Sequence, residues 1–224
     1  MSGLRVVSWN VRSLRDDAAG VARVLAGLAP DVVLLQEAPR LLGSGWANRR
    51  LARRAGLTRV AGGAAAHGNL LLVGRRTTVV TASVLRLPRR PGLHRRGAVV
   101  GVVELAGARL AVAGTHLDLD PLARLDSARR VRTAAAGLGN LLVLCADVNE
   151  EPGGPAWAEL SAGLVDTAAA CGPTFPLRAP RRRIDVLLAD PRLVVQAVEV
   201  PRVGPVTDHL PLVLDLAWPP GRTD

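Results

Sequence analysis

The chain of 224 residues contains no lysine and no tyrosine, and it has only two cysteines. Two cysteines cannot build a disulfide framework, which excludes a small disulfide-stapled scaffold. Cys145 lies inside an apolar run, so we expect it to pack as a small hydrophobic side chain. The chain also lacks an HExxH motif and the Cys/His spacings of zinc sites, which argues against a zinc enzyme or zinc finger.

Long hydrophobic runs and targeting segments are also absent. No stretch approaches the roughly 18 uninterrupted apolar residues of a membrane span. The chain enters the apolar-rich segment 4–11 without the charged and apolar regions of a secretory signal. We therefore expect a soluble cytoplasmic protein without a transmembrane segment. The sequence does not indicate an oligomeric state.

Because lysine is absent, all 29 basic residues are arginine, and the formal net charge is +10. Such a charge ordinarily indicates an anionic partner, nucleic acid above all. The heavy use of Arg, Ala, Gly, Leu and Val is typical of a GC-rich coding bias. Such a bias weakens the inference of an anionic partner from the net charge. Two arginine-rich loops, 86–96 and 176–183, are either solvated surfaces or contacts for a phosphate backbone beside a site.

The order of elements favours a single α/β domain over residues 1–224, since no internal repeat or long linker divides the chain. Residues 4–11, 16–30 and 31–37 are typical of a strand, an amphipathic helix and a second strand. This sequence of elements is characteristic of a parallel α/β unit.

Later in the chain, strands outnumber helices. Segments 67–76 and 77–87 are expected as consecutive antiparallel strands, and 98–118 as a hairpin. A doubly wound fold would alternate strands and helices strictly, so we expect a four-layered α/β sandwich instead, with two mixed β-sheets face to face and helices outside. The further helices are expected at 46–56, 121–138 and 155–163, and the further strands at 141–146, 183–190, 192–200 and 209–217.

Polar side chains stand at the ends of six predicted strands. Taken singly, each has an ordinary explanation as a turn residue, a loop histidine or a partner of arginine. Taken together, carboxylates gathered at one sheet edge repel one another unless a positive charge holds them. Oxygen ligands suit a hard cation, Mg²⁺ or Mn²⁺, which is suited to phosphoryl chemistry. The residues are Asn10, Glu37, His116, Asp147 with Asn149, Asp185, and Asp208 with His209.

Six strings in order carry a family resemblance: SWNVRSL, DVVLLQE, GTHLD, ADVNEEP, RRRIDVLLAD and TDHLPLVLDL. With them the chain resembles the endonuclease/exonuclease/phosphatase family of metal-dependent phosphoesterases, from Leu4 to about Trp218. The resemblance implies a four-layered α/β sandwich with its site in a cleft at one edge of the two sheets. It also implies a metal site with Glu37 as direct ligand and with Asn10 and Asp208 in or near it.

The same resemblance implies catalytic roles. Asp147 would orient or deprotonate the attacking water, and Asn149 would hold Asp147 or a phosphate oxygen. His209 would contact the scissile phosphate, with Asp185 fixing its tautomer. His116 would be a second histidine at the phosphate.

Three further residues are weaker candidates. Arg12 and Asn69 are candidates for substrate binding. His67 is a candidate for the rim of the cleft, although a solvated histidine is the simpler explanation.

These residues predict a metal-dependent hydrolase of phosphodiester bonds, with an endonuclease or exonuclease acting on nucleic acid as the first interpretation. The alternative is a phosphatase or phospholipid-type phosphodiesterase on a smaller or membrane substrate, favoured by His116 and by short loops that leave the cleft open. The short loop 200–207 argues against a DNA-bending abasic-site endonuclease. A catalytically silent basic binding module is the third possibility, and the presence of Glu37, Asp147 and His209 argues against it.

Overall fold

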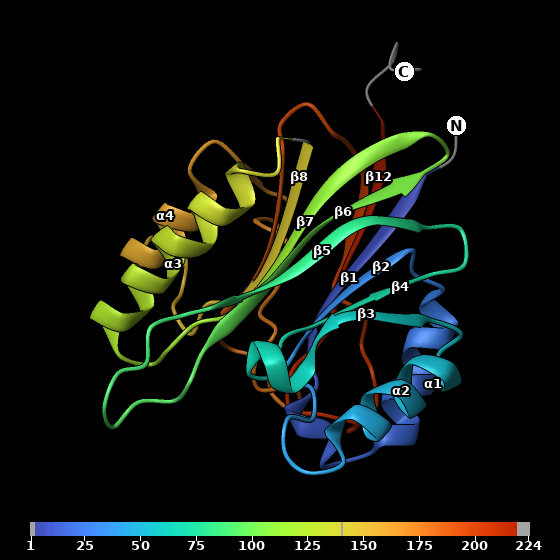
Figure 1. The fold of residues 1–224 in the computed structure, drawn as a ribbon, viewed down its shortest axis with the longest axis horizontal. Helices are drawn as coiled ribbons and strands as arrows, with labels where there is room; N and C mark the ends of the chain where they lie inside the picture. The colour runs from blue at the N-terminus through green and yellow to red at the C-terminus, as the bar shows by residue number, and fades with distance from the viewer. Residues whose placement is uncertain (1–2, 140, 219–224) are drawn as a thin grey trace.

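The computed structural model describes residues 3–139 and 141–218, and Figure 1 shows two β-sheets with helices on their outer faces. The strand order is β11-β12-β1-β2-β4-β3 in the first sheet and β5-β6-β7-β8-β10-β9 in the second. The strands of the first sheet are β1 (Leu4–Asn10), β2 (Val32–Gln36), β3 (Thr58–Gly62), β4 (Leu70–Val73), β11 (Val194–Glu199) and β12 (Leu212–Ala217). Those of the second are β5 (Thr78–Arg86), β6 (Gly97–Leu105), β7 (Ala108–His116), β8 (Leu141–Asp147), β9 (Val165–Asp166) and β10 (Asp185–Ala189).

Two of the helices begin at side-chain caps. Asp17 accepts from Gly20 N at 2.8 Å and starts α1 (Ala18–Leu28). Asp120 accepts from Ala123 N at 2.8 Å and starts α3 (Pro121–Ala136). The other helices are α2 (Ser44–Arg54), α4 (Pro155–Ser161) and two 3₁₀ turns, Arg12–Leu14 and Gly63–Ala66. Among the described residues, no helix has the length and apolar character needed to cross a bilayer.

Three buried clusters fill the spaces between four layers. Alternate residues of a strand face opposite sides, so Val6 packs between the sheets while Val7 packs under α1 and α2. In the second sheet, Val112 joins the cluster between the sheets and Ala113 packs under α3 and α4. The four-layered α/β sandwich predicted from the sequence is therefore confirmed.

Each sheet contains one parallel strand pair. In the first sheet β1 runs parallel to β2, and α1 connects them; in the second, β7 runs parallel to β8, and α3 connects them. The strands β12 and β10 are antiparallel to β1 and β8. The carboxyl ends of the parallel pairs and the amino ends of β12 and β10 consequently meet at one edge of the sandwich, which is the lower edge in Figure 1.

The pairing expected between 67–76 and 77–87 is wrong. Both segments contain strands, but β4 pairs with β2 and β3, whereas β5 pairs with β6 in the other sheet. The chain turns away from the first sheet after β4, where Gly74 N donates to Asp31 O at 2.8 Å. Apolar alternation shows which residues face a core but does not identify the partner strand. The strand β3 was not predicted.

Candidate active site

The predicted strand-end residues lie together at this edge. Asn10, His116 and Asp147 are the last residues of β1, β7 and β8, and Asp185 is the first of β10. In the second sheet, His116 pairs with Asp147 and Asp147 with Asp185 in register. Glu37 directly follows β2. These polar residues are far apart in the sequence. They are neighbours in the structure because the strands within each sheet are in register and both sheets end at the same edge.

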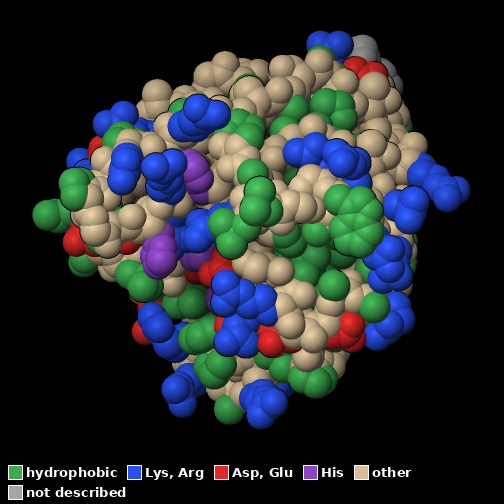
Figure 2. Space-filling model, turned by 60° about the horizontal axis from the view of Figure 1, so that its bottom comes forward, with side chains coloured by type: hydrophobic (Ala, Val, Ile, Leu, Met, Phe, Trp, Pro, Cys, Tyr) green, Lys and Arg blue, Asp and Glu red, His purple; other side chains and the backbone are tan. Residues whose placement is uncertain are grey.

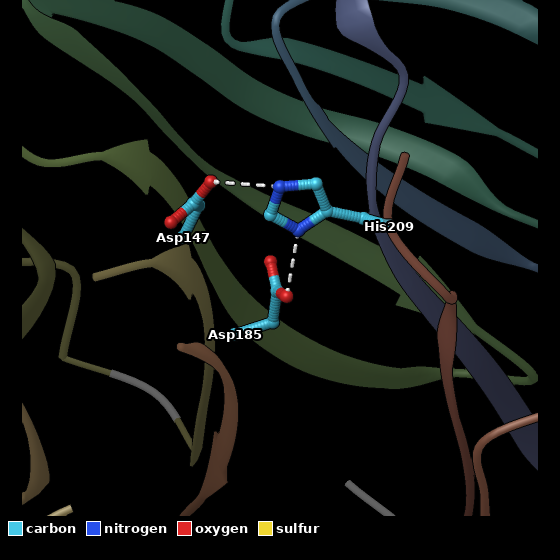
Figure 3. Close-up of side chains that lie close together, drawn as sticks. All are labelled: Asp147, Asp185 and His209. Carbon is cyan, nitrogen blue, oxygen red and sulfur yellow. Dashed lines mark hydrogen bonds and ion pairs between the residues drawn. The ribbon is translucent and has the colours of Figure 1, made fainter. Parts of the chain in front are cut away.

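Figure 3 shows His209 between two buried carboxylates. Its Nδ1 lies 2.9 Å from Asp185 Oδ2, and its Nε2 lies 3.8 Å from Asp147 Oδ2. Thr174 Oγ1 also donates to Asp185 Oδ2, at 2.5 Å. Burial disfavours a charged ring, but Asp185, its hydrogen bond and Asp147 raise the pKa of His209 to about 9. His209 is therefore an imidazolium at neutral pH, held in one orientation by Asp185.

The position of His209 is set by contacts with β1. Trp9 Nε1 donates to His209 O at 2.9 Å, and Thr207 Oγ1 donates to Asn10 O at 3.1 Å. These bonds tie segment 207–209 to the end of β1 across about 200 residues of sequence. The histidine is thus mounted on the first sheet while its carboxylate partners come from the second.

Asp147 is 1% exposed and accepts hydrogen bonds from two residues. Asn10 Nδ2 donates to its Oδ2 at 2.8 Å, and Asn149 N donates to its Oδ1 at 3.1 Å. Burial alone would raise the pKa of this carboxyl, but the charge of His209 and the hydrogen bonds from Asn10 and Asn149 outweigh burial and hold the pKa below its usual value. Asp147 is therefore an ionised carboxylate in a buried site.

Glu37 stands on the other side of Asn10 and is more open. Its Oε1 lies 3.5 Å from Asn10 Nδ2 and 3.8 Å from His116 Nδ1, and its side chain is 40% exposed. Its φ of 50° is the left-handed conformation, which turns the chain sharply as it leaves β2. Both contacts are at or beyond the limit of a hydrogen bond, so the carboxylate retains capacity for a further partner.

His116 is neutral at this site. Asn149 Nδ2 lies 2.9 Å from His116 Nε2 and also donates to Leu117 O at 3.0 Å. With the amide donating, Nε2 is the acceptor, and the ring proton lies on Nδ1, toward Glu37. Burial lowers the pKa of His116 to about 4. The two histidines of the site are thus in opposite charge states.

Arg12 and Asp208 contact each other. Arg12 Nε lies 3.3 Å from Asp208 Oδ2, and Arg12 Nη1 lies 3.2 Å from Asp16. Both Arg12 and Asp208 are partly exposed, and Asp208 directly precedes His209 in the chain. The predicted substrate-binding arginine is thus engaged with acidic side chains in this structure.

Asn69 is not placed as a substrate ligand. It is 1% exposed, and its amide donates to Ala66 O at 3.0 Å and Gly97 O at 2.9 Å. Both donors are therefore used to join the turn before β4 to the start of β6. The substrate contact of Asn69 stays a prediction, and its position at a strand end could not reveal that its amide hydrogens are taken by carbonyls.

A cleft of about 710 Å³ opens beside these residues, and Glu37, His116 and Asn149 are the members of the site that line it. Figure 2 looks toward this edge and shows histidines in a hollow, with arginine and apolar side chains around it. His67 lines the cleft as expected of a rim residue. Burial and the nearby Arg40 lower the pKa of His67.

Arg96 is a cleft residue that the sequence did not single out. Its side chain is only 11% exposed, and its Nε lies 3.6 Å from Asp118 Oδ2 without a hydrogen bond to any described residue. Burial lowers its pKa, although the guanidinium stays charged at neutral pH. The arginine-rich loop 86–96 was a visible signal, but nothing in it distinguished this arginine from its exposed neighbours.

A second unpredicted element is the buried pair of Arg124 and Glu150. Arg124 donates to Glu150 Oε1 at 3.1 Å and to the carbonyls of Leu119 and Asn149 at 3.0 and 3.3 Å. Glu150 Oε2 accepts from Trp157 N at 2.9 Å. The pair fastens the two loops that follow His116 and Asp147 to α3 and α4.

Comparison with known proteins agrees with this geometry. The profile of the Endonuclease/Exonuclease/phosphatase family matches residues 7–209, and the chain belongs to this family. Fold and family together support phosphoester hydrolysis as its class of reaction. No curated protein matches the chain.

Three solved structures with the same fold illustrate the similarity. An endonuclease/exonuclease/phosphatase from Beutenbergia cavernae is 25% identical, with 98% of this chain and 72% of that chain covered and a TM-score of 0.72. The mannosyl-6-phosphatase Bt3783 of Bacteroides thetaiotaomicron is 18% identical, with 96% and 100% covered and a TM-score of 0.80. D. rerio TDP2 with a single-strand DNA product is 18% identical, with 97% and 100% covered and a TM-score of 0.76.

Proposed function

We propose that this protein is a divalent-cation-dependent phosphodiesterase in which Asp147 directs a water molecule at phosphorus. The observation that carries this proposal is the setting of the Asp147 carboxylate, which is 1% exposed and accepts hydrogen bonds from Asn10 and Asn149. A buried carboxylate fixed by donors and lying beside an imidazolium has the geometry of a positioned base. His209 supplies that imidazolium at 3.8 Å.

The donors at Glu37 fit a hard cation. Glu37 has two long contacts and an open carboxylate, and Asp208 Oδ1 has only a 3.4 Å contact from Thr207. Oxygen donors of this kind suit Mg²⁺ or Mn²⁺, which would neutralise charge on the phosphate. Asn10 directs its amide hydrogens at the carboxylates of Glu37 and Asp147, so it supports the metal site by orienting them.

A second group of ligand atoms gives a different cation position. One ligand atom each from Asp147, Asp185 and His209 lies within 4.8 Å of the others. His209 already bonds Asp185 and carries a positive charge between the two acids. Because His209 Nδ1 already bonds Asp185, we propose the more open carboxylates of Glu37 and Asp208 as the cation ligands instead.

Each side chain of the site has a separate role in the in-line attack of water on phosphorus. Asp147 accepts a proton of the attacking water while Asn149 holds Asp147 in place. The imidazolium of His209 lies where it can donate to a phosphate oxygen, and Asp185 fixes its tautomer. His116 lines the cleft as a second phosphate contact.

Nucleic acid is the first candidate substrate, since the chain carries 29 arginines and a relative of the same fold was solved with a DNA product. The alternative is a smaller or membrane-borne phosphodiester or phosphomonoester. One specific observation favours the alternative: Leu41, Leu42 and Leu119 line the cleft and are strongly exposed. Leucine offers neither charge for phosphates nor a ring for bases.

Hydrolysis of bis(p-nitrophenyl) phosphate with Mg²⁺, Mn²⁺ or EDTA tests the reaction class. We expect cation-dependent turnover that falls on the order of 10² to 10⁴-fold in Asp147→Asn. Asp126→Asn, which alters a partly exposed acid on α3, is the matched control and should retain activity. Turnover that EDTA leaves intact, or equal activity of Asp147→Asn and the control, would contradict the proposal.

Plasmid DNA and RNA separate the candidate substrates under the same conditions. Cation-dependent cleavage of either supports the nuclease. Turnover of the small ester without any cleavage of nucleic acid would exclude the nuclease in favour of the alternative. Salt-sensitive DNA binding without any turnover would replace both by a silent binding module.

A further inference from the structure

The mouth of the cleft carries an unusual set of exposed apolar side chains. Leu41, Leu42 and Leu119 are 79%, 105% and 66% exposed, and Trp46 and Leu122 are exposed as well. We name these five residues the apolar rim. The other strongly exposed large apolar residues among those described are valines of β5, β9 and β11, and each is at most 46% exposed.

The apolar rim stands on both sides of the cleft. Leu41 and Leu42 precede α2, and Trp46 lies in its first turn, beyond the end of β2 in the first sheet. Leu119 and Leu122 flank the start of α3, beyond the end of β7 in the second sheet. Leu41, Leu42, Trp46 and Leu119 all line the same cleft as Glu37 and His116.

These side chains are exposed because the backbone beneath them is fixed. Arg124 donates to the carbonyls of Asp118 and Leu119 at 3.2 and 3.0 Å, which holds the second side of the apolar rim. On the first side, Gly43 takes a φ of 78° directly before α2, and Ser44 N donates to Leu41 O at 3.0 Å. The leucines therefore point to solvent from rigid turns and have no core to enter.

Positive charge accompanies the apolar rim. Arg15, Arg40 and Arg96 line the cleft, and the Arg50 guanidinium lies 5.0 Å from the Trp46 ring centre. Figure 2 shows arginine and apolar side chains interleaved around the histidines on this face. Leucine and tryptophan side chains insert into the headgroup region of a bilayer, and neighbouring arginines are attracted to anionic lipids. The mouth of the cleft combines both kinds of side chain.

We propose that the apolar rim docks the protein on an anionic phospholipid membrane, with the cleft facing the headgroups. A protein partner bound to the apolar rim would cover the cleft. A bilayer would cover the cleft as well, and it would also present phosphoesters to it. Nucleic acid would use the arginines and Trp46 but would leave the leucines in water. The docking itself needs no turnover, and only the choice of membrane phosphoesters as substrate rests on the proposed phosphodiesterase function.

Co-sedimentation with vesicles tests the docking in EDTA, where catalysis plays no part. The vesicles are phosphatidylcholine alone or phosphatidylcholine with phosphatidylglycerol, each at low and high salt. We expect binding to the anionic vesicles, weakened by salt, and weakened on the order of tenfold or more in Leu41→Ser/Leu42→Ser. The matched control Val194→Ser/Val195→Ser removes exposed apolar side chains from β11, away from the cleft, and should bind as the wild type does.

Three outcomes would overturn the docking: wild-type protein that stays in solution with the anionic vesicles, equal binding of the two double variants, or binding that an oligonucleotide abolishes while the leucines make no difference. The last outcome would assign this face to nucleic acid. Melting temperatures of both variants identify any loss of fold. Hydrolysis of the soluble diester by the wild type is measured separately, so failure of the docking and failure of the phosphodiesterase are distinguishable.

Discussion

Replacing Arg124 by methionine should destabilise the protein strongly and loosen its active site. Methionine keeps much of the side-chain volume but removes the bonds to Glu150 and to the carbonyls of Asp118, Leu119 and Asn149. The side chains of Arg124 and Glu150 are 10% and 12% exposed, so the carboxylate would be left unpaired and nearly buried. Breaking a buried ion pair from one side costs about 3–5 kcal/mol.

The lower end of that range applies because a tenth of each side chain reaches water. A loss of about 3 kcal/mol lowers the melting temperature of a domain of this size by roughly 6–12 °C. Arg130→Met on the same helix is the control, since its pair with Asp126 is about half exposed and contributes less than about 1 kcal/mol. Thermal unfolding followed by circular dichroism measures both variants.

Activity provides a second measurement on the same variants. Arg124→Met releases the loop that carries Asn149, so kcat for the soluble diester should fall on the order of tenfold while Arg130→Met is unaffected. In a double-mutant cycle, Glu150→Gln should add little to Arg124→Met, because the two residues share one interaction. Equal melting temperatures for Arg124→Met and Arg130→Met would refute the role assigned to the buried pair.

Three further predictions concern the cleft. Arg96→Met should raise KM for an anionic diester on the order of tenfold with a smaller change in kcat, and an unchanged KM would remove Arg96 from substrate binding. His209→Gln should lower kcat on the order of 10² to 10⁴-fold and also lower the melting temperature, since it removes the charged partner of buried Asp185; a variant with wild-type kcat would make His209 dispensable. Stability in EDTA should decline on both sides of about pH 6.5. Although burial opposes the charge, Asp185 and Asp147 raise the His209 pKa to about 9, so its contribution is full below pH 6.5 and is lost as pH rises through about 9. Burial lowers the His116 pKa to about 4, so stability is also lost as pH falls from 6.5 toward 4, and chemical denaturation across this range should show less acid loss in His116→Gln.

The sequence alone was sufficient for the architecture and for the polar side chains that meet at one edge of the sandwich. Strand-end positions identified Asn10, Glu37, His116, Asp147 and their partners, because a strand that stops at a polar residue delivers it to a sheet edge whatever the fold around it. The order of the strings carried the family, and the matching profile confirms it. The catalytic role of each residue and the single domain over 1–224 stay predictions.

Strand pairing and side-chain pairing depended on the tertiary structure. Strands β4 and β5 are consecutive yet belong to different sheets, because each completes its hydrogen bonds with strands distant in sequence. Arg12 was expected at the substrate but lies against Asp208, and Asn69 was expected there but donates to two carbonyls. Local sequence could not decide these cases, since both residues have several possible partners.

Burial distinguishes two arginines at the edge of the sandwich from the exposed ones. In a chain with 29 arginines, nothing local marks Arg96 or Arg124, and only the folded chain shows that their side chains are about 90% buried. The sequence by itself determined which chemical groups reach the edge of the sandwich, through strand periodicity and strand ends. The tertiary structure alone decided which charges lose their water there, because desolvation depends on every element that packs around a group.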